Sequence, residues 1–343
     1  MIFAFPFMKD IDSLKEHLER AQNPVFFYDN DCDGLCSFIL LRRFLGRGKG
    51  VAIRTNPEID DGYARKVQEF NADYVFVLDK PFLGQKFLDE IAKSHVPVVW
   101  VDHHDVVKPE YSYENLFIYN FNEPVTSFVY KMTKRKEDLW IAIMGCIADH
   151  YLPDFTEDFI SGYKELWAKN INEPFDAYYK TEIGLLARAL NFGLKDRTSH
   201  VVYLQNFLIN AESPKDILLE LETGSSFGKK YREIKKKYDE LVSRAKNHIG
   251  DKVVFFKYGG SLSISSDVAN ELSYLYPKKY IIVAYDKGAI SNLSLRGKNV
   301  REIFERVIVK FEGASGGGHK DAIGARLRTE DLERFKNEFE KEI

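Results

Sequence analysis

Residues 25–37 run Val25-Phe26-Phe27-Tyr28-Asp29-Asn30-Asp31-Cys32-Asp33-Gly34-Leu35-Cys36-Ser37. The apolar start is typical of a strand covered on both faces, and residues 35–44 have helical spacing. The three aspartates repel one another, and directly after a buried strand they are poorly solvated without a counter-charge. We therefore expect a strand, a turn and a helix, with a cation at the turn. Open α/β folds bind ligands at this carboxyl edge of the sheet.

Two simpler interpretations of the acidic turn stay open. The carboxylates are compatible with a solvated turn or with one structural calcium, although no Glu follows at the twelfth position as in an EF-hand loop. Cys32 and Cys36 flank the turn. A zinc site would need a second pair of such ligands, so we expect both cysteines to be small buried residues.

Two more predicted strands end in carboxylates. Residues 74–78 are followed by Asp79, and residues 98–101 are followed by Asp102-His103-His104-Asp105. The carboxyl ends of parallel strands share one edge of a sheet, so these side chains are expected to meet the acidic turn. Each residue alone has an ordinary explanation as a turn residue or a surface histidine, but their convergence on one edge indicates a metal site.

A further carboxylate, Asp149, closes the apolar helix predicted at 141–148. Several carboxylates with histidine favour hard or borderline divalent cations, with manganese or magnesium ahead of zinc. Two ions bridged by a shared carboxylate would neutralise the cluster, activate water and stabilise the attacking and leaving oxygens at phosphorus. These residues therefore predict phosphodiester hydrolysis.

The composition describes a globular protein with room for two domains. The chain has 343 residues, of which 45% are hydrophobic and 14% aromatic. Its net charge of −3 means that any nucleic-acid binding must be local. No apolar run approaches about 18 residues, and residues 1–8 lack the basic start of a signal peptide. We therefore expect a cytoplasmic protein with no membrane partner.

The order of the patterns predicts a two-domain α/β protein. Strands alternate with helices up to about residue 150, which indicates a parallel sheet flanked by helices. Only helical patterns follow until about residue 247, and strand patterns then return. We expect a catalytic metal-binding domain, a helical linker and a smaller C-terminal α/β domain with a mixed sheet, at residues 1–155, 156–249 and 250–343.

The C-terminal part contains the glycine run Gly316-Gly317-Gly318, followed by His319. Such a backbone can approach an anion closely, so we predict a phosphate cradle, although a flexible turn has the same composition. Arg296, at the end of a predicted strand, is a natural second phosphate contact. The lysine-rich helix at 228–238 fits either contact with a phosphate backbone or an ordinary solvated face.

At these positions the chain resembles the DHH phosphoesterases. The superfamily's four motifs match in order and spacing at Asp29–Gly34, Asp79, Asp102-His103-His104 and Asp149. The segment Gly316–His319 resembles the signature of the DHHA1 domain. The first motif is most similar to that of the archaeal RecJ-like nucleases.

The resemblance implies two manganese or magnesium ions, with Asp79 as the bridging ligand. The implied ligands are Asp31, Asp33, Asp79, His103 and Asp149. Relatives that act on small molecules often have a histidine where this chain has Phe27, and Asp29 is expected to take its place at the metal. Asp102 would support the ligands, and His104 would help to polarise the phosphate or the leaving group. Arg296 and Gly316–His319 would hold the nucleic acid.

The resemblance further implies a single-strand-specific exonuclease on DNA, RNA or both, active in replication or repair. A narrow channel between two lobes would admit one strand and exclude a duplex. A GINS-type replication factor or a repair helicase is the expected protein partner. Two alternatives stay open. One is a phosphodiesterase for short oligonucleotides (nanoRNA) or cyclic dinucleotides. The other is a scaffold subunit of a helicase assembly, against which the intact acids argue.

Overall fold

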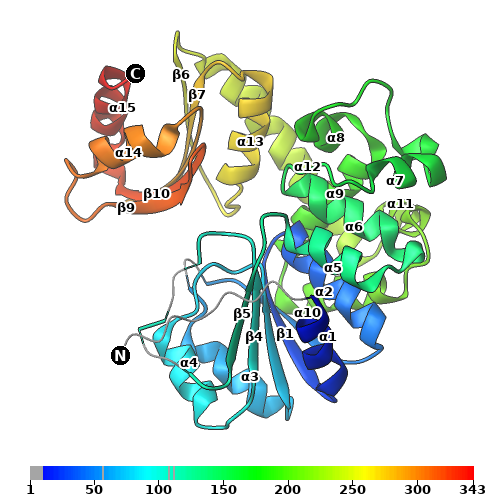
Figure 1. The fold of residues 1–343 in the computed structure, drawn as a ribbon. Coiled ribbons are helices and arrows are strands. Elements are labelled where there is room, and N and C mark those ends of the chain that lie inside the picture. The colour runs from blue at the N-terminus through cyan, green and yellow to red at the C-terminus, as the bar shows by residue number, and fades with distance from the viewer. Residues whose placement is uncertain (1–10, 56–57, 107–108, 111–112) are drawn as a thin grey trace. The chain divides into compact units, whose positions relative to one another are not determined.

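The computed structural model describes residues 11–55, 58–106, 109–110 and 113–343 (Figure 1). Packing divides the chain into two compact units, one extending to Arg232 and one beginning at Glu233. Residues 1–8, on which the expectation about a signal peptide rests, lie outside the described residues. Within the described ranges, no helix combines the length and the apolar character needed to span a membrane.

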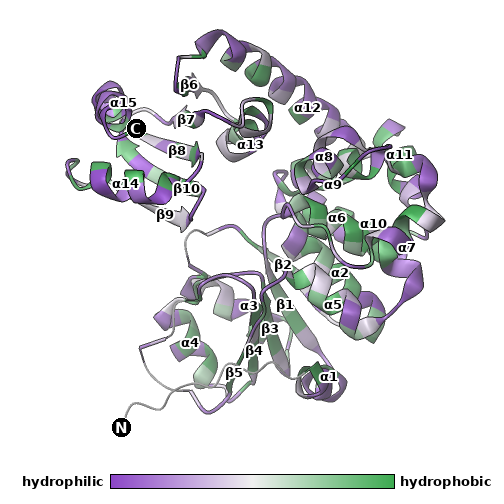
Figure 2. Cartoon of the chain, turned by 45° about the horizontal axis from the view of Figure 1, so that its top comes forward, coloured by the Kyte–Doolittle hydropathy of each residue, from purple (hydrophilic) through white to green (hydrophobic). Residues whose placement is uncertain are grey.

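The first unit contains a five-stranded parallel sheet with the strand order β2-β1-β3-β4-β5. The strands are β1 (Pro24–Asp29), β2 (Lys49–Ile53), β3 (Tyr74–Leu78), β4 (Val98–Asp102) and β5 (Leu116–Asn120). Hydrophobic residues dominate the central strands β1, β3 and β4 (Figure 2). Because all five strands run in one direction, Asp29, Asp79 and Asp102 emerge at the same edge. The predicted parallel sheet is confirmed.

Each face of this sheet has its own hydrophobic core, because successive strand residues point to opposite faces. Phe26 and Phe76 belong to one core, and their neighbours Phe27 and Val77 belong to the other. The first core also contains side chains from α1 (Ile11–Arg20), α2 (Cys32–Leu45), α5 (Val125–Thr133) and α6 (Leu139–Ala148). The second contains side chains from α3 (Ala64–Glu69) and α4 (Gln85–Ala92).

The stretch expected to be a linker is helical. Its helices are α7 (Thr156–Gly162), α8 (Pro174–Lys180), α9 (Glu182–Leu194), α10 (Thr198–Asn210), α11 (Pro214–Glu222) and α12 (Ser226–Ala245). The sequence patterns predict helices at 157–168, 181–194, 211–223 and 227–249, so they missed α8 and α10. Helix α10 is rich in β-branched and aromatic residues, and burial of Leu204 and Leu208 in the first core favours it against its propensity. The boundaries at 155 and 249 stay a prediction.

The second unit has a mixed five-stranded sheet with the order β6-β7-β8-β10-β9, in which only the β6–β7 pair is parallel. Its elements are β6 (Val253–Gly259), α13 (Ser265–Leu275), β7 (Tyr280–Asp286), β8 (Ile290–Arg296), α14 (Val300–Ile308), β9 (Ser315–His319), β10 (Ala322–Arg328) and α15 (Leu332–Lys341). Short 3₁₀ turns lie in the first unit at Asp61–Tyr63, Lys136–Asp138 and Lys164–Leu166, and in the second at Lys246–His248 and Thr329–Asp331. The predicted mixed sheet is confirmed, whereas α13 and β9 were not predicted.

A buried ion pair ties α2 to the start of α6. Arg43 Nε lies 2.7 Å from Asp138 Oδ1, and the Asp138 side chain is fully buried. A second guanidinium nitrogen of Arg43 donates to the carbonyl of Ala211, at 2.6 Å, and so holds the end of α10 as well. Arg135 Nε donates to the other carboxylate oxygen of Asp138 at 2.8 Å. Arg43, whose side chain is 11% exposed, thus joins α2 to the start of α6 and the end of α10.

We expect Arg43→Met to destabilise the first unit by about 3 kcal/mol, because it leaves the buried Asp138 with a single cationic partner. Urea unfolding followed by tryptophan fluorescence measures this unit alone, since the only tryptophans are Trp100, Trp140 and Trp167. The control Arg20→Met breaks an exposed pair with Glu16 and should change stability by less than about 1 kcal/mol. Equal losses in the two variants would contradict this assignment.

Candidate metal centre

The acidic turn after β1 is shaped by the first residues of α2. Asp31 caps the helix, because its Oδ1 accepts a hydrogen bond from the backbone N–H of Gly34 at 2.9 Å. A Cβ atom at Gly34 would lie 2.4 Å from the carbonyl oxygen of Asp29. Only glycine therefore allows the helix to begin so close to the strand, and the turn forms as the sequence predicts.

Asp33 points into the protein and is held by the start of α5. Its side chain is buried, and its two oxygens accept hydrogen bonds from the backbone N–H groups of Val125 (3.0 Å) and Thr126 (2.9 Å). The hydroxyl of Thr126 donates to the Asp33 carbonyl at 2.9 Å. The N-terminus of a helix favours negative charge, so this contact fixes the orientation of the carboxylate and stabilises its ionised form.

Asp79, the first residue after β3, is buried and has a left-handed backbone with φ +58°. Its N–H donates to the carbonyl of Val101 at 2.9 Å. Its Oδ1 lies 3.3 Å from His103 Nε2 and 3.6 Å from His104 Nδ1. Within the described part of the chain this oxygen accepts no hydrogen bond. A buried carboxylate oxygen that faces two imidazoles in this way suits a cation.

Asp102, at the end of β4, shapes the turn that presents the two histidines. It is fully buried, and its Oδ1 accepts hydrogen bonds from the backbone N–H groups of His103 (2.7 Å) and His104 (2.6 Å). The same oxygen lies 2.8 Å from His104 Nδ1. Asn120 on β5 donates to the carbonyl of His104 at 2.8 Å. Asp102 therefore orients both histidines.

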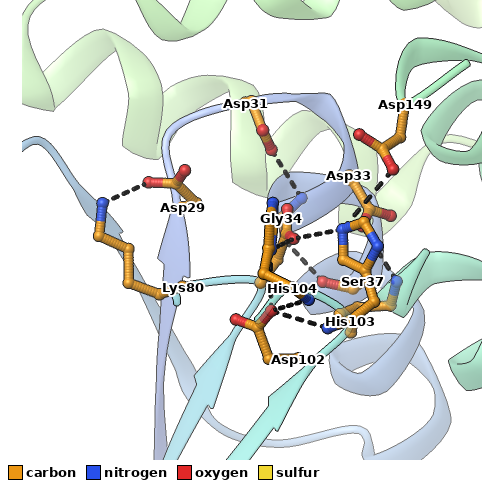
Figure 3. Close-up of polar contacts among 12 residues, drawn as sticks. Asp29, Asp31, Asp33, Gly34, Ser37, Lys80, Asp102, His103, His104 and Asp149 are labelled. Carbon is orange, nitrogen blue, oxygen red and sulfur yellow. Dashed lines mark hydrogen bonds and ion pairs between the residues drawn. The ribbon is translucent and has the colours of Figure 1, made fainter. Parts of the chain in front are cut away.

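The structure brings most of the predicted ligands together (Figure 3). Among the residues that the structure describes, two sets of side chains offer ligand atoms within 4.8 Å of one another, and both contain His103. One set is Asp79, His103 and His104, and the other is Asp33, His103 and Asp149. Asp31 belongs to the same cluster, because the Asp79 side chain influences the pKa of its carboxyl group. Carboxylate oxygens with imidazole nitrogens form the donor set that manganese or magnesium accepts, so the residues present fit such ions.

The electrostatics of the cluster also favour a cation. Burial and the charge of Asp29 raise the pKa of Asp31 to about 6, and burial raises that of Asp33 to about 7. Burial and the surrounding carboxylates hold the pKa values of Asp79 and Asp149 well above their ordinary range. Without a counter-charge these acids bind protons more readily than ordinary carboxyl groups do, and a divalent cation would favour their ionised forms.

The pKa of His104 is raised, which favours the charged form of its imidazole. Burial alone would lower its pKa, but the hydrogen bond and the charge of Asp102 outweigh burial and raise the pKa to about 9. The imidazole is therefore protonated at neutral pH, which is the state that donates to an anion.

Asp29 is not part of either ligand set. Its Oδ1 lies 3.0 Å from Lys80 Nζ, and Figure 3 shows its carboxylate directed toward that lysine, apart from Asp33, His103 and Asp149. Our sequence reasoning missed Lys80, which is 3% exposed. The only available signal was a lysine placed directly after the carboxylate that ends a buried strand.

The predicted phosphate contacts lie in the second unit. Arg296 donates from Nε to Asn270 Oδ1 at 2.6 Å, and the sheet register aligns it through Ala322 with His319. The glycine run forms the exposed edge strand β9. A Cβ atom at Gly318 would lie 2.3 Å from the Ala322 carbonyl oxygen, and φ is +149° there. The run is therefore an ordered strand that requires glycine at this position, not a flexible turn.

The chain is similar to known proteins in part of its sequence and in its fold. Residues 250–343 match the family described as the DHHA1 domain. No curated protein matches the sequence. RecJ from Thermus thermophilus, in complex with Mn²⁺, has a TM-score of 0.66 at 13% identity over 96% of this chain and 53% of that one. The chain thus spans about half the length of that RecJ.

Two further solved structures are similar over almost their whole length. An exonuclease RecJ bound to manganese has a TM-score of 0.64 at 14% identity, covering 99% of this chain and 95% of that one. CDC45 from Entamoeba histolytica has a TM-score of 0.56 at 12% identity, covering 97% and 98%. The shared two-domain fold and the matched DHHA1 domain confirm the resemblance found in the sequence. Residues 250–343 therefore form a DHHA1 domain, and the chain as a whole shares the fold of these solved structures.

Proposed function

We propose that this chain is a metal-dependent phosphodiesterase. The proposal rests on the convergence of Asp33, Asp79, His103 and Asp149 at the carboxyl edge of the first sheet, where a buried Asp79 oxygen lies 3.3 Å from His103 Nε2. Together with Asp31 these residues would hold two divalent cations, Mn²⁺ or Mg²⁺. Such ions, when bound, would supply the Lewis acidity and the activated water that hydrolysis of a phosphodiester requires.

The side chains around the proposed metal centre and in the second unit are assigned the remaining roles in orienting groups and binding phosphate. Asp102 orients the two histidines through its hydrogen bonds to their backbone N–H groups. We assign His104 to the phosphoryl or leaving oxygen, because Asp102 Oδ1 lies 2.8 Å from its Nδ1 and so orients the ring. In the second unit, Arg296 and His319 occupy one row of the sheet and are assigned to phosphate contacts of the substrate.

We further propose that the substrate is single-stranded DNA or RNA and that the enzyme is an exonuclease of the archaeal RecJ-like type. This part of the proposal is supported by the fold shared with the RecJ exonuclease and by the form of the first motif, Asp29–Gly34. The net charge of −3 confines contacts with nucleic acid to local groups of residues. A cytoplasmic location and docking on a replication or repair-helicase partner belong to the same proposal.

In the presence of Mn²⁺, the wild-type chain should release mononucleotides from one end of a single-stranded oligonucleotide labelled separately at each end. Asp79→Ala and His103→Ala remove central ligands and should lower the rate at least about 1,000-fold, the scale expected when metal activation of water is lost. The control Asp105→Asn changes an exposed acid in the same turn and should retain the wild-type rate.

Each other outcome of this experiment has a definite meaning. Cleavage of dinucleotides with an intact long strand would replace the exonuclease by a small-substrate phosphodiesterase. Cleavage of a blunt duplex without unwinding would contradict single-strand specificity. A wild-type chain that hydrolyses neither substrate, yet copurifies with a helicase subunit, would indicate a scaffold.

Mn²⁺ affinity should rise between pH 6 and pH 8. The raised pKa values of Asp31 (about 6) and Asp33 (about 7) mean that protons compete with the ion at the lower pH and are lost at the higher one. The stability of the metal-free fold should change with pH in the opposite direction. Raised carboxyl pKa values stabilise the metal-free fold below their unfolded values near 3.8, and this contribution disappears as pH rises through about 7. Calorimetric titration with Mn²⁺ at the two pH values measures the first effect, and pH-independent affinity would contradict it.

A further inference from the structure

Lys80 is a buried cation next to the candidate metal centre, and the proposed hydrolysis assigns it no role. The residue is 3% exposed and directly follows Asp79. Its Nζ lies 3.0 Å from Asp29 Oδ1 and donates to the carbonyl of Thr55 at 3.0 Å. Lysine is almost never buried to this extent without a partner, so these two contacts account for its position.

The contacts of Lys80 connect the carboxyl ends of neighbouring strands. Asp29 ends β1, Thr55 follows β2, and Lys80 itself follows β3. The Lys80 carbonyl also accepts a hydrogen bond from Nε1 of the buried Trp100 on β4, at 2.8 Å. In the sheet order β2-β1-β3-β4, Lys80 therefore connects the ends of β1, β2 and β3 and contacts the side chain of Trp100 in the middle of β4.

The contacts of Lys80 adjoin the strained backbone of Asp79. Its φ is +58°, in the left-handed region that aspartate adopts more readily than most residues but still at some cost in energy. On one side the Asp79 N–H is bonded to the carbonyl of Val101 at 2.9 Å. On the other side the chain continues directly into Lys80, which is fixed by its backbone and by its side chain. A metal ligand must be held accurately, and the groups around it usually do so.

We propose that Lys80 is a positioning residue for Asp79 and that Asp29 acts by holding Lys80, not as a metal ligand. The inference rests on the proposed function, because it presumes that Asp79 binds the metal. A positioning role and a purely electrostatic role of Lys80 predict opposite changes in metal affinity when the residue is removed. A positive charge near a cation site weakens cation binding, so removal of a mere charge would tighten it. Removal of a positioning residue weakens it.

Calorimetric titration of the full chain with Mn²⁺ distinguishes these roles. Lys80→Met keeps the length of the side chain but removes the ammonium, and it should weaken Mn²⁺ binding about 10- to 100-fold, as loss of a supporting group does. If Asp29 acts only through Lys80, Asp29→Asn should add no further loss in the Lys80→Met background. Unchanged or tighter binding by Lys80→Met would overturn the proposal, as would a further tenfold loss in the double variant.

Two comparisons keep the test decisive. Arg43→Met destabilises the same unit at a distance from the turn and should bind Mn²⁺ like the wild type, and an equal loss of affinity there would overturn a positioning role. If Lys80→Met does not fold, Asp29→Asn is compared with Asp31→Asn, and equal losses would mark Asp29 as a ligand and overturn the proposal. A wild-type chain without Mn²⁺ affinity would instead remove the proposed function itself.

Discussion

Mutual repulsion among carboxylates gathered at one edge of a parallel sheet is the constraint on which this structure depends. Asp31, Asp33, Asp79 and Asp149 come from three places in the chain, and burial raises the pKa of each. The fold limits the repulsion locally, with the start of α5 donating two N–H groups to Asp33. A divalent cation would complete the compensation, which is why we interpret the cluster as a metal centre.

Much of this arrangement was predictable because it follows from strand periodicity and direction. The apolar runs before Asp29, Asp79 and Asp102 are buried as expected, and parallel pairing brings their ends to one edge. The glycine at position 34 was part of the predicted turn, and the structure shows its reason in the close approach of α2 to the Asp29 carbonyl. Short-range patterns were sufficient for these features, since each depends on neighbouring residues.

Other features depend on contacts between distant residues and were not predictable from local patterns. Helix α10 forms because Leu204 and Leu208 pack in a core built from other segments, although its composition does not favour a helix. Lys80 contacts Asp29 and Thr55 because the strand order brings the ends of β1, β2 and β3 together. No single segment of the sequence carries the information about that order. For the same reason Asp29, assigned to the metal by resemblance, is directed toward this lysine in the structure.

The central claim is that the cluster around Asp79 and His103 binds divalent metal. Crystals grown with Mn²⁺ and measured at its absorption edge would test it directly, because the anomalous signal locates manganese independently of the protein. Our account predicts anomalous peaks in contact with Asp79 and His103, with Asp29 still paired to Lys80. Crystals without a peak among these residues, or with manganese bound by Asp29 in place of Lys80, would contradict it.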